Sequence, residues 1–97
     1  MSTKAYILIE TSVGKSKYVS DQLRGLNSVV RVDAVTGPYD IIAVVNAPDL
    51  TTVGDLVTSQ IHVIDGIVRT ITCLSMGTLT PFLNTSSFFI SSISTNE

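Results

Sequence analysis

The centre of the chain, residues 29–46, reads VVRVDAVTGPYDIIAVVN, and this stretch decides the predicted fold. Residues 29–36 are rich in β-branched side chains with polar residues interspersed, and residues 41–46 form a second run of strand-forming residues. Between the two runs, Gly37-Pro38-Tyr39-Asp40 combines residue types that favour tight turns. The stretch therefore predicts a β-hairpin.

The segment before the hairpin predicts a strand and then a helix. Residues 4–11 (KAYILIET) are apolar and rich in strand-forming residues. A helix is expected after Gly14, with three apolar side chains on one face: Val19, Leu23 and Leu26.

The segment after the hairpin predicts a second helix and a last strand. Asp49 is expected to cap the helix, which Asp65-Gly66 ends. Its apolar residues are spaced to lie on one face: Leu50, Val53, Val57, Ile61 and Ile64. Residues 67–76 (IVRTITCLSM) are typical of a strand. The predicted element order is therefore β-α-β-β-α-β.

A weak internal repeat indicates how these elements are arranged. Residues 26–31 (LNSVVR) and 64–69 (IDGIVR) are alike and occupy the same helix-to-strand position. The chain thus consists of two β-α-β halves, which commonly close into one sheet. We expect an α+β, ferredoxin-like fold, with a four-stranded antiparallel sheet and both helices on one face.

The predicted strands are apolar on both faces, which two helices cannot cover. In the first strand, Tyr6 and Leu8 point one way while residues 5, 7 and 9 point the other. The chain is 44% hydrophobic and 14% charged over 97 residues, which is unusually apolar for a small domain. We expect the second face to pack against another copy, giving a homo-oligomer, and the alternative is that the C-terminal segment folds over it.

The composition disfavours several classes of protein and of site. The net charge of −2 gives no basic surface for nucleic acid, and no apolar run reaches the length of about 18 residues that a membrane helix needs. Cys73, the single cysteine, excludes an intrachain disulfide and favours a cytoplasmic protein. We expect Cys73 to be a buried, inert thiol and His62 to be a surface residue. No catalytic residues, metal site or cofactor are predicted.

The last segment, residues 77–97, differs in composition from residues 1–76, which we take as the folded domain. All three Phe lie in this C-terminal extension among many Ser and Thr. Residues 86–94 (SSFFISSIS) suit an extra strand or a segment packed on a neighbouring subunit, and disorder is the alternative.

The hairpin turn and the last strand also carry a family resemblance over about residues 3–76. The sequence resembles the stand-alone effector-binding (RAM) domain of the Lrp/AsnC transcription regulators. The resemblance lies in residues 5–9, Gly14-Lys15, Val29, the Gly37-Pro38-Tyr39-Asp40 turn, residues 65–67, and Thr70-Ile71-Thr72. The resemblance implies a dimeric α+β barrel that assembles into higher oligomers and binds an amino acid or similar small effector. It implies that the chain modulates transcription regulators, including full-length Lrp/AsnC members, without binding DNA itself.

By position, the resemblance assigns ligand binding to Gly37, Tyr39, Asp40, Thr70 and Thr72. Backbone N–H groups of the glycine turn suit the carboxylate of an amino acid, while Asp40 or the threonine hydroxyls suit its ammonium. From the residues alone, an ordinary turn and threonines selected for strand propensity remain the alternative. A small enzyme of the dimeric α+β-barrel class is the second functional hypothesis.

We expect residues 1–97 to show no binding to random duplex DNA at low salt. Only three residues precede Lys4, so the helix-turn-helix of the family is not expected there, and the net charge is −2. Gel retardation measures this directly. A retarded band that weakens steeply with added salt would contradict the charge argument.

Overall fold

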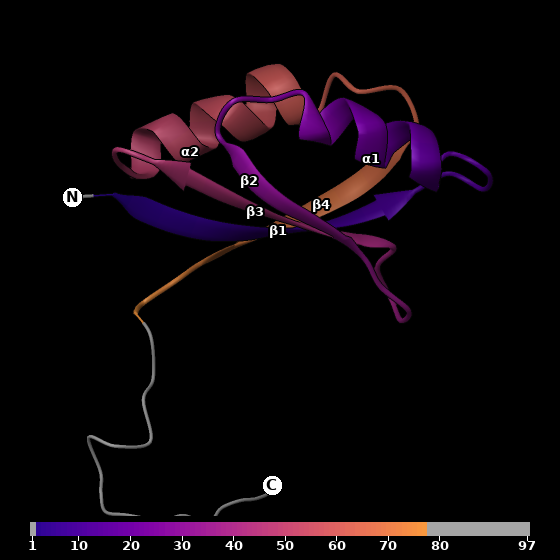
Figure 1. Cartoon of the computed structure of the whole chain (residues 1–97), viewed down its shortest axis with the longest axis horizontal. Coiled ribbons are helices and arrows are strands. Elements are labelled where there is room, and N and C mark those ends of the chain that lie inside the picture. The colour runs from indigo at the N-terminus through magenta and orange to yellow at the C-terminus, as the bar shows by residue number, and fades with distance from the viewer. Residues whose placement is uncertain (1, 78–97) are drawn as a thin grey trace, which may run out of the picture.

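The computed structural model describes residues 2–77, which form one antiparallel sheet with helices on one face (Figure 1). The elements are β1 (Thr3–Thr11), α1 (Ser16–Arg24), β2 (Val29–Ala34), β3 (Ile41–Ala47), α2 (Leu50–Leu56), the π-helical segment η1 (Val57–Ile61) and β4 (Ile67–Leu74). The strand order is β2-β3-β1-β4. The predicted element order and the ferredoxin-like α+β fold are confirmed. The proposed packing of the C-terminal extension concerns residues outside those described, apart from Gly77.

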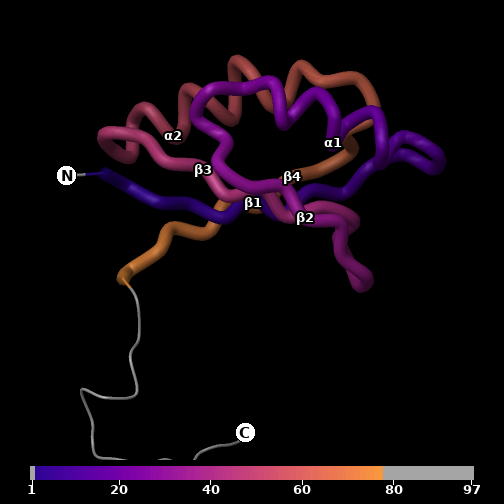
Figure 2. Tube along the Cα trace, in the orientation of Figure 1, coloured from indigo at the N-terminus to yellow at the C-terminus, as the bar shows by residue number. Residues whose placement is uncertain are grey.

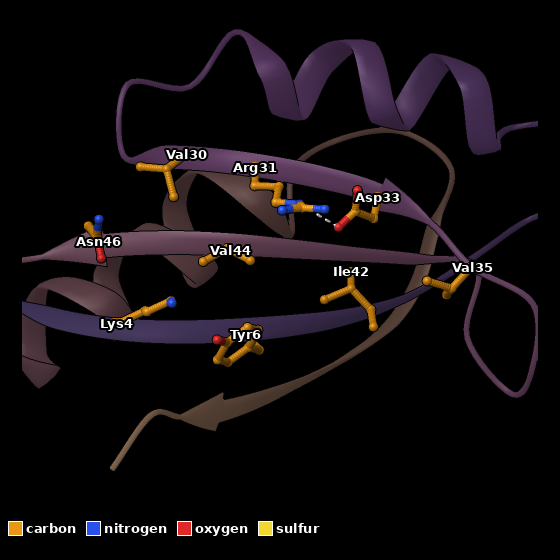
Figure 3. A pocket seen from close by; sticks show the side chains of 9 residues that line it. All are labelled: Lys4, Tyr6, Val30, Arg31, Asp33, Val35, Ile42, Val44 and Asn46. Atoms are coloured by element: carbon orange, nitrogen blue, oxygen red, sulfur yellow. Dashed lines mark hydrogen bonds and ion pairs between the residues drawn. The ribbon is translucent and has the colours of Figure 1, made fainter. Parts of the chain in front are cut away.

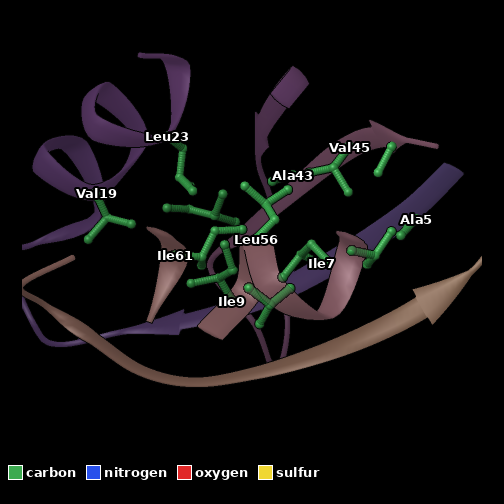
Figure 4. Packing of buried hydrophobic residues seen from close by; sticks show 13 residues of the cluster. Ala5, Ile7, Ile9, Val19, Leu23, Ala43, Val45, Leu56 and Ile61 are labelled. Atoms are coloured by element: carbon green, nitrogen blue, oxygen red, sulfur yellow. The ribbon is translucent and has the colours of Figure 1, made fainter. Parts of the chain in front are cut away.

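The hydrophobic core lies between the helices and one face of the sheet (Figure 4). Ala5, Ile7 and Ile9 alternate along β1 and are completely buried. Their neighbours on β3 and the apolar faces of the helices complete the cluster: Ile41, Ala43, Val45, Ala47, Val19, Leu23, Val53, Leu56, Val57 and Ile61. The predicted helix faces are therefore largely correct.

In the second helical segment the predicted Asp49 cap is confirmed, whereas Leu50 and the last turns depart from the prediction. Leu50 is 59% exposed, because a side chain at the first residue of a helix projects beyond the helix start rather than onto the sheet. The Asp49 carboxylate caps the helix by accepting hydrogen bonds from the backbone N–H and the hydroxyl of Thr52, both at 2.8 Å. These bonds, the backbone one most of all, lower the pKa of Asp49. The helix then widens into η1, where the His62 N–H bonds to the Val57 carbonyl at 2.8 Å.

The opposite face of the sheet, called the open face here, is apolar at its centre and uncovered by any described helix. Leu8 lies beside Ile42 on β3 and Ile71 on β4, so three adjacent strands place apolar side chains together. The predicted division of the strands into two apolar faces is confirmed. The prediction that Cys73 is buried is wrong for the single chain, because Cys73 pairs with Tyr6 across the open face and is exposed.

The hairpin turn lies at the end of the sheet opposite to the start of β1 and the end of β4. Figure 2 shows the chain entering β1 and leaving β4 at one end of the sheet, with the hairpin turn at the other. The Ser75 N–H to Lys4 carbonyl bond, 2.8 Å long, marks the first end. None of the helices in residues 2–77 combines the length and the apolar character that spanning a bilayer requires.

The turn into β4 depends on Gly66, which packs directly against the start of α1. Its φ is +102°, and a Cβ added there would lie 2.8 Å from the Cβ of Lys15. The Gly66 carbonyl also accepts a 2.8 Å bond from the N–H of Ser12. The residue therefore joins β4 closely to the loop between β1 and α1.

Gly66→Ala should lower the free energy of unfolding by about 1–3 kcal/mol, because it adds both backbone strain and a close contact. Gly54→Ala is the matched control, since a Cβ at this helical position would meet nothing within 4 Å. That control should be neutral or stabilising by up to about 1 kcal/mol. Urea denaturation measures both, and equal effects of the two substitutions would contradict the packing described for Gly66.

Candidate functional site

The hairpin turn is an exposed loop that is held at its two ends. The Val35 N–H bonds to the Asp40 carbonyl at 2.9 Å and closes the loop of residues 36–39. Gly37 has a φ of +146°, a conformation that favours glycine. Within the described chain, none of residues 36–39 takes part in a backbone hydrogen bond. The turn therefore presents free backbone N–H groups, although not at Pro38, which has none.

Asp40 connects this turn to the end of β1 through three hydrogen bonds. Its backbone N–H donates to the Ile9 carbonyl at 2.9 Å. Its carboxylate Oδ2 accepts from the Thr11 N–H at 2.8 Å and from the Thr11 hydroxyl at 3.2 Å. The Thr11 hydroxyl also lies 2.8 Å from that of Ser16 at the start of α1. The turn, β1 and α1 thus form one connected polar network.

Tyr39 is held on the other side of the turn by Arg69 of β4. The guanidinium lies 5.5 Å from the centroid of the Tyr39 ring, a cation–π distance. The same guanidinium forms a 3.3 Å ion pair with Glu10. Glu10 and Arg69 are directly paired across β1 and β4 and lie on the open face. Arg69 therefore contacts the turn through the ring of Tyr39.

The two predicted threonines lie on the opposite side of β4 from Arg69. Thr70 pairs with Ile9 and Thr72 with Ile7, so both share the helix side of the sheet. The Thr70 hydroxyl lies 2.7 Å from Nε2 of His62. Within one chain, the five predicted residues thus form two groups, one at the turn and one along the edge strand.

Sequence reasoning missed Thr11 and Arg69, which hold the turn in place. Both lie far from residues 37–40 in sequence, and their contacts depend on the strand order. The available signal was the repeat, because Arg31 and Arg69 occupy equivalent positions in the two halves. The repeat indicates that both arginines lie at equivalent positions of edge strands, but it does not predict a contact with Tyr39.

The open face carries a separate, shallow groove of about 530 Å³ (Figure 3). Its residues come from β2, β3 and β1 and from the segment after β2: Lys4, Tyr6, Val30, Arg31, Asp33, Val35, Ile42, Val44 and Asn46. Val44 on its floor is only 7% exposed. A 2.8 Å ion pair between Arg31 and Asp33 lies toward one edge. An apolar floor with a charged border is typical of a surface that packs against protein.

A second hollow of about 410 Å³ lies beside the edge strand and is lined by His62 and residues 67–70. The hydroxyl of Thr70 and the imidazole of His62 are its paired polar groups. In residues 2–77, no three side chains among His, Cys, Asp and Glu gather closely enough to hold a metal ion.

Comparison with known proteins identifies the family of this fold. The family model of the Lrp/AsnC ligand binding domain matches residues 4–83. The crystal structure of TTHA0845 from Thermus thermophilus is 31% identical with a TM-score of 0.76, and the alignment covers 80% of this chain and 98% of that chain. A search of curated proteins found no match.

Two regulators share the fold at lower identity. Escherichia coli AsnC is 22% identical with a TM-score of 0.75, over 78% of this chain and 52% of AsnC. The transcriptional regulator NMB0573 from Neisseria meningitidis, solved in complex with L-Met, is 14% identical with a TM-score of 0.73, over 80% of this chain and 52% of that protein. This chain therefore spans about half the length of either regulator. The family match over most of the sequence, together with the fold, shows that the chain belongs to the Lrp/AsnC ligand-binding domain family.

Proposed function

We propose that this protein is a non-enzymatic module that binds an amino acid or similar small molecule and forms homo-oligomers, which modulate transcription regulators. The family match carries this proposal, and the complex of the Neisseria meningitidis regulator with L-Met supports the class of ligand. Full-length regulators of the same family are the proposed partners, and the cytoplasm is the proposed location.

The proposed ligand site combines the hairpin turn of one copy with β4 of another. Gly37 and Tyr39 offer free backbone N–H groups, which can hold the carboxylate of an amino acid. Thr70 and Thr72 offer hydroxyls, which can accept from its ammonium. A single chain places these two groups on different faces of β4, so a site that uses both requires a second subunit.

The open face is the proposed surface of homodimerisation. Its central apolar residues, Leu8, Ile42 and Ile71, lie side by side on three strands. Ile71 is 42% exposed in the single chain. Packing of two such faces would remove this apolar area from water, which stabilises association in proportion to the area buried. The same surface would allow co-assembly with a related regulator domain.

Leu8→Glu should convert the oligomer to monomers or unfold it, because an unpaired charge buried at the interface costs several kcal/mol. Val13→Glu is the matched control, since Val13 lies in an exposed loop and should not affect assembly. Light scattering at micromolar concentration measures the mass. A wild-type mass of 10.4 kDa, that of a single chain, would overturn the proposed dimer.

A thermal-shift screen of the twenty amino acids should identify a ligand that raises the melting temperature. A ligand at one hundred times its Kd adds about 2.7 kcal/mol of apparent stability. Thr72→Val should then weaken binding by roughly tenfold, because a hydrogen bond between a hydroxyl and a charged ammonium contributes about 1.5 kcal/mol or more. Thr51→Val, at an exposed helical position, is the matched control. If no amino acid shifts the melting temperature, the proposed ligand class is wrong.

A further inference from the structure

Asp40 is the residue of the turn with the most contacts to the rest of the fold. Its backbone extends the β2–β3 pairing through Val35 and bonds to Ile9 of β1, both at 2.9 Å. Residues 36–39 have no such anchors within the described chain. The position of the free N–H groups in the turn therefore depends on how firmly Asp40 is held.

The side chain of Asp40 adds a second attachment through one oxygen. Oδ2 accepts from both the backbone N–H and the hydroxyl of Thr11. An ionised carboxylate can only accept hydrogen bonds, so the Thr11 hydroxyl must be the donor in its bond to Asp40. Because a hydroxyl donates only one hydrogen bond, the Thr11 hydroxyl must accept the 2.8 Å bond from the hydroxyl of Ser16. The three groups form a directed chain of hydrogen bonds from α1 through β1 to the turn, and such chains reinforce each bond.

We propose that Asp40 is a positioning residue, which locks the effector-binding turn to β1 through Thr11 and acts on the ligand through the turn rather than by pairing with its ammonium. This inference rests on the proposed function of the turn. It assigns the ligand's ammonium to the threonine hydroxyls and the ligand's carboxylate to the backbone N–H groups of the turn. Asp40 then holds the turn in position without touching the ligand.

The hydrogen bonds with Thr11 and a contact with the ligand ammonium make different demands on the side chain of residue 40. Both donors of Thr11 are neutral, so they need an acceptor oxygen with two lone pairs but no negative charge. The amide oxygen of an asparagine meets that need. A direct contact between Asp40 and the ligand ammonium would instead depend on the carboxylate charge, because a neutral amide in its place loses the Coulomb attraction of an ion pair. Asp40→Asn and Asp40→Ala therefore separate the two roles.

The first measurement uses the ligand-free protein. The Thr11 amide should be protected from hydrogen exchange in the wild type and in Asp40→Asn, but exchange faster in Asp40→Ala, in which residues 36–39 should also gain motion. Asp55→Asn and Asp55→Ala are the matched controls, because Asp55 is exposed on α2 and lies outside both the turn and β1. An unchanged turn and unchanged Thr11 protection in Asp40→Ala would overturn the lock, whether or not a ligand is known.

The second measurement is calorimetric titration with the best amino acid from the thermal-shift screen. Asp40→Ala should bind roughly tenfold or more weakly, whereas Asp40→Asn should stay within about threefold of the wild type. Equal losses in both variants would show that the charge itself contacts the ligand and would overturn the inference. A wild type that binds no amino acid would refute the proposed function, and the exchange measurement would still decide whether the lock exists.

Discussion

The two central strands carry apolar side chains on both faces, while residues 2–77 supply helices for only one. This constraint organises the rest of the molecule. Ile7 and Ala43 bury themselves under α1 and α2, and the hydrophobic effect of this burial holds the layers together. Leu8 and Ile42, one residue along on the same strands, remain on the open face. The stable fold and the proposed association of two copies therefore depend on the same pair of strands.

The candidate site lies where three segments meet at one end of that sheet. The hairpin between β2 and β3 meets the end of β1 and the start of β4 there. Each of these two strands contributes one side-chain contact to the turn. Thr11 holds the carboxylate of Asp40, and Arg69 lies over the ring of Tyr39. A surface loop is thereby positioned by rigid strands, which is the usual arrangement for ligand-binding loops. The backbone donors of residues 36–39 stay free because the main-chain hydrogen bonds hold only the ends of the turn, at Val35 and Asp40.

The features predicted from sequence are those that depend on local pattern. Alternation along residues 5–9 separated the two faces of β1 without saying which one the helices cover, and residues 37–40 identified the hairpin. Leu50 and Cys73 were placed wrongly because periodicity assigns a side to a residue but not whether anything covers that side. The division of the site into two groups was not foreseen, since it depends on the register of β4 against β1. Contacts such as that between Thr11 and Asp40 join residues 29 positions apart and leave no periodic signal.

The placement of the strand ends relative to the turn limits what a bound ligand can touch. The start of β1 and the end of β4 lie at one end of the sheet and the hairpin turn at the other (Figure 2). β1 comprises nine residues, so a domain attached ahead of it would be separated from the turn by about 30 Å of extended strand. Because β1 is paired with β3 and β4 along its length, that separation is fixed. A ligand at the turn would therefore not contact such a domain directly within one chain.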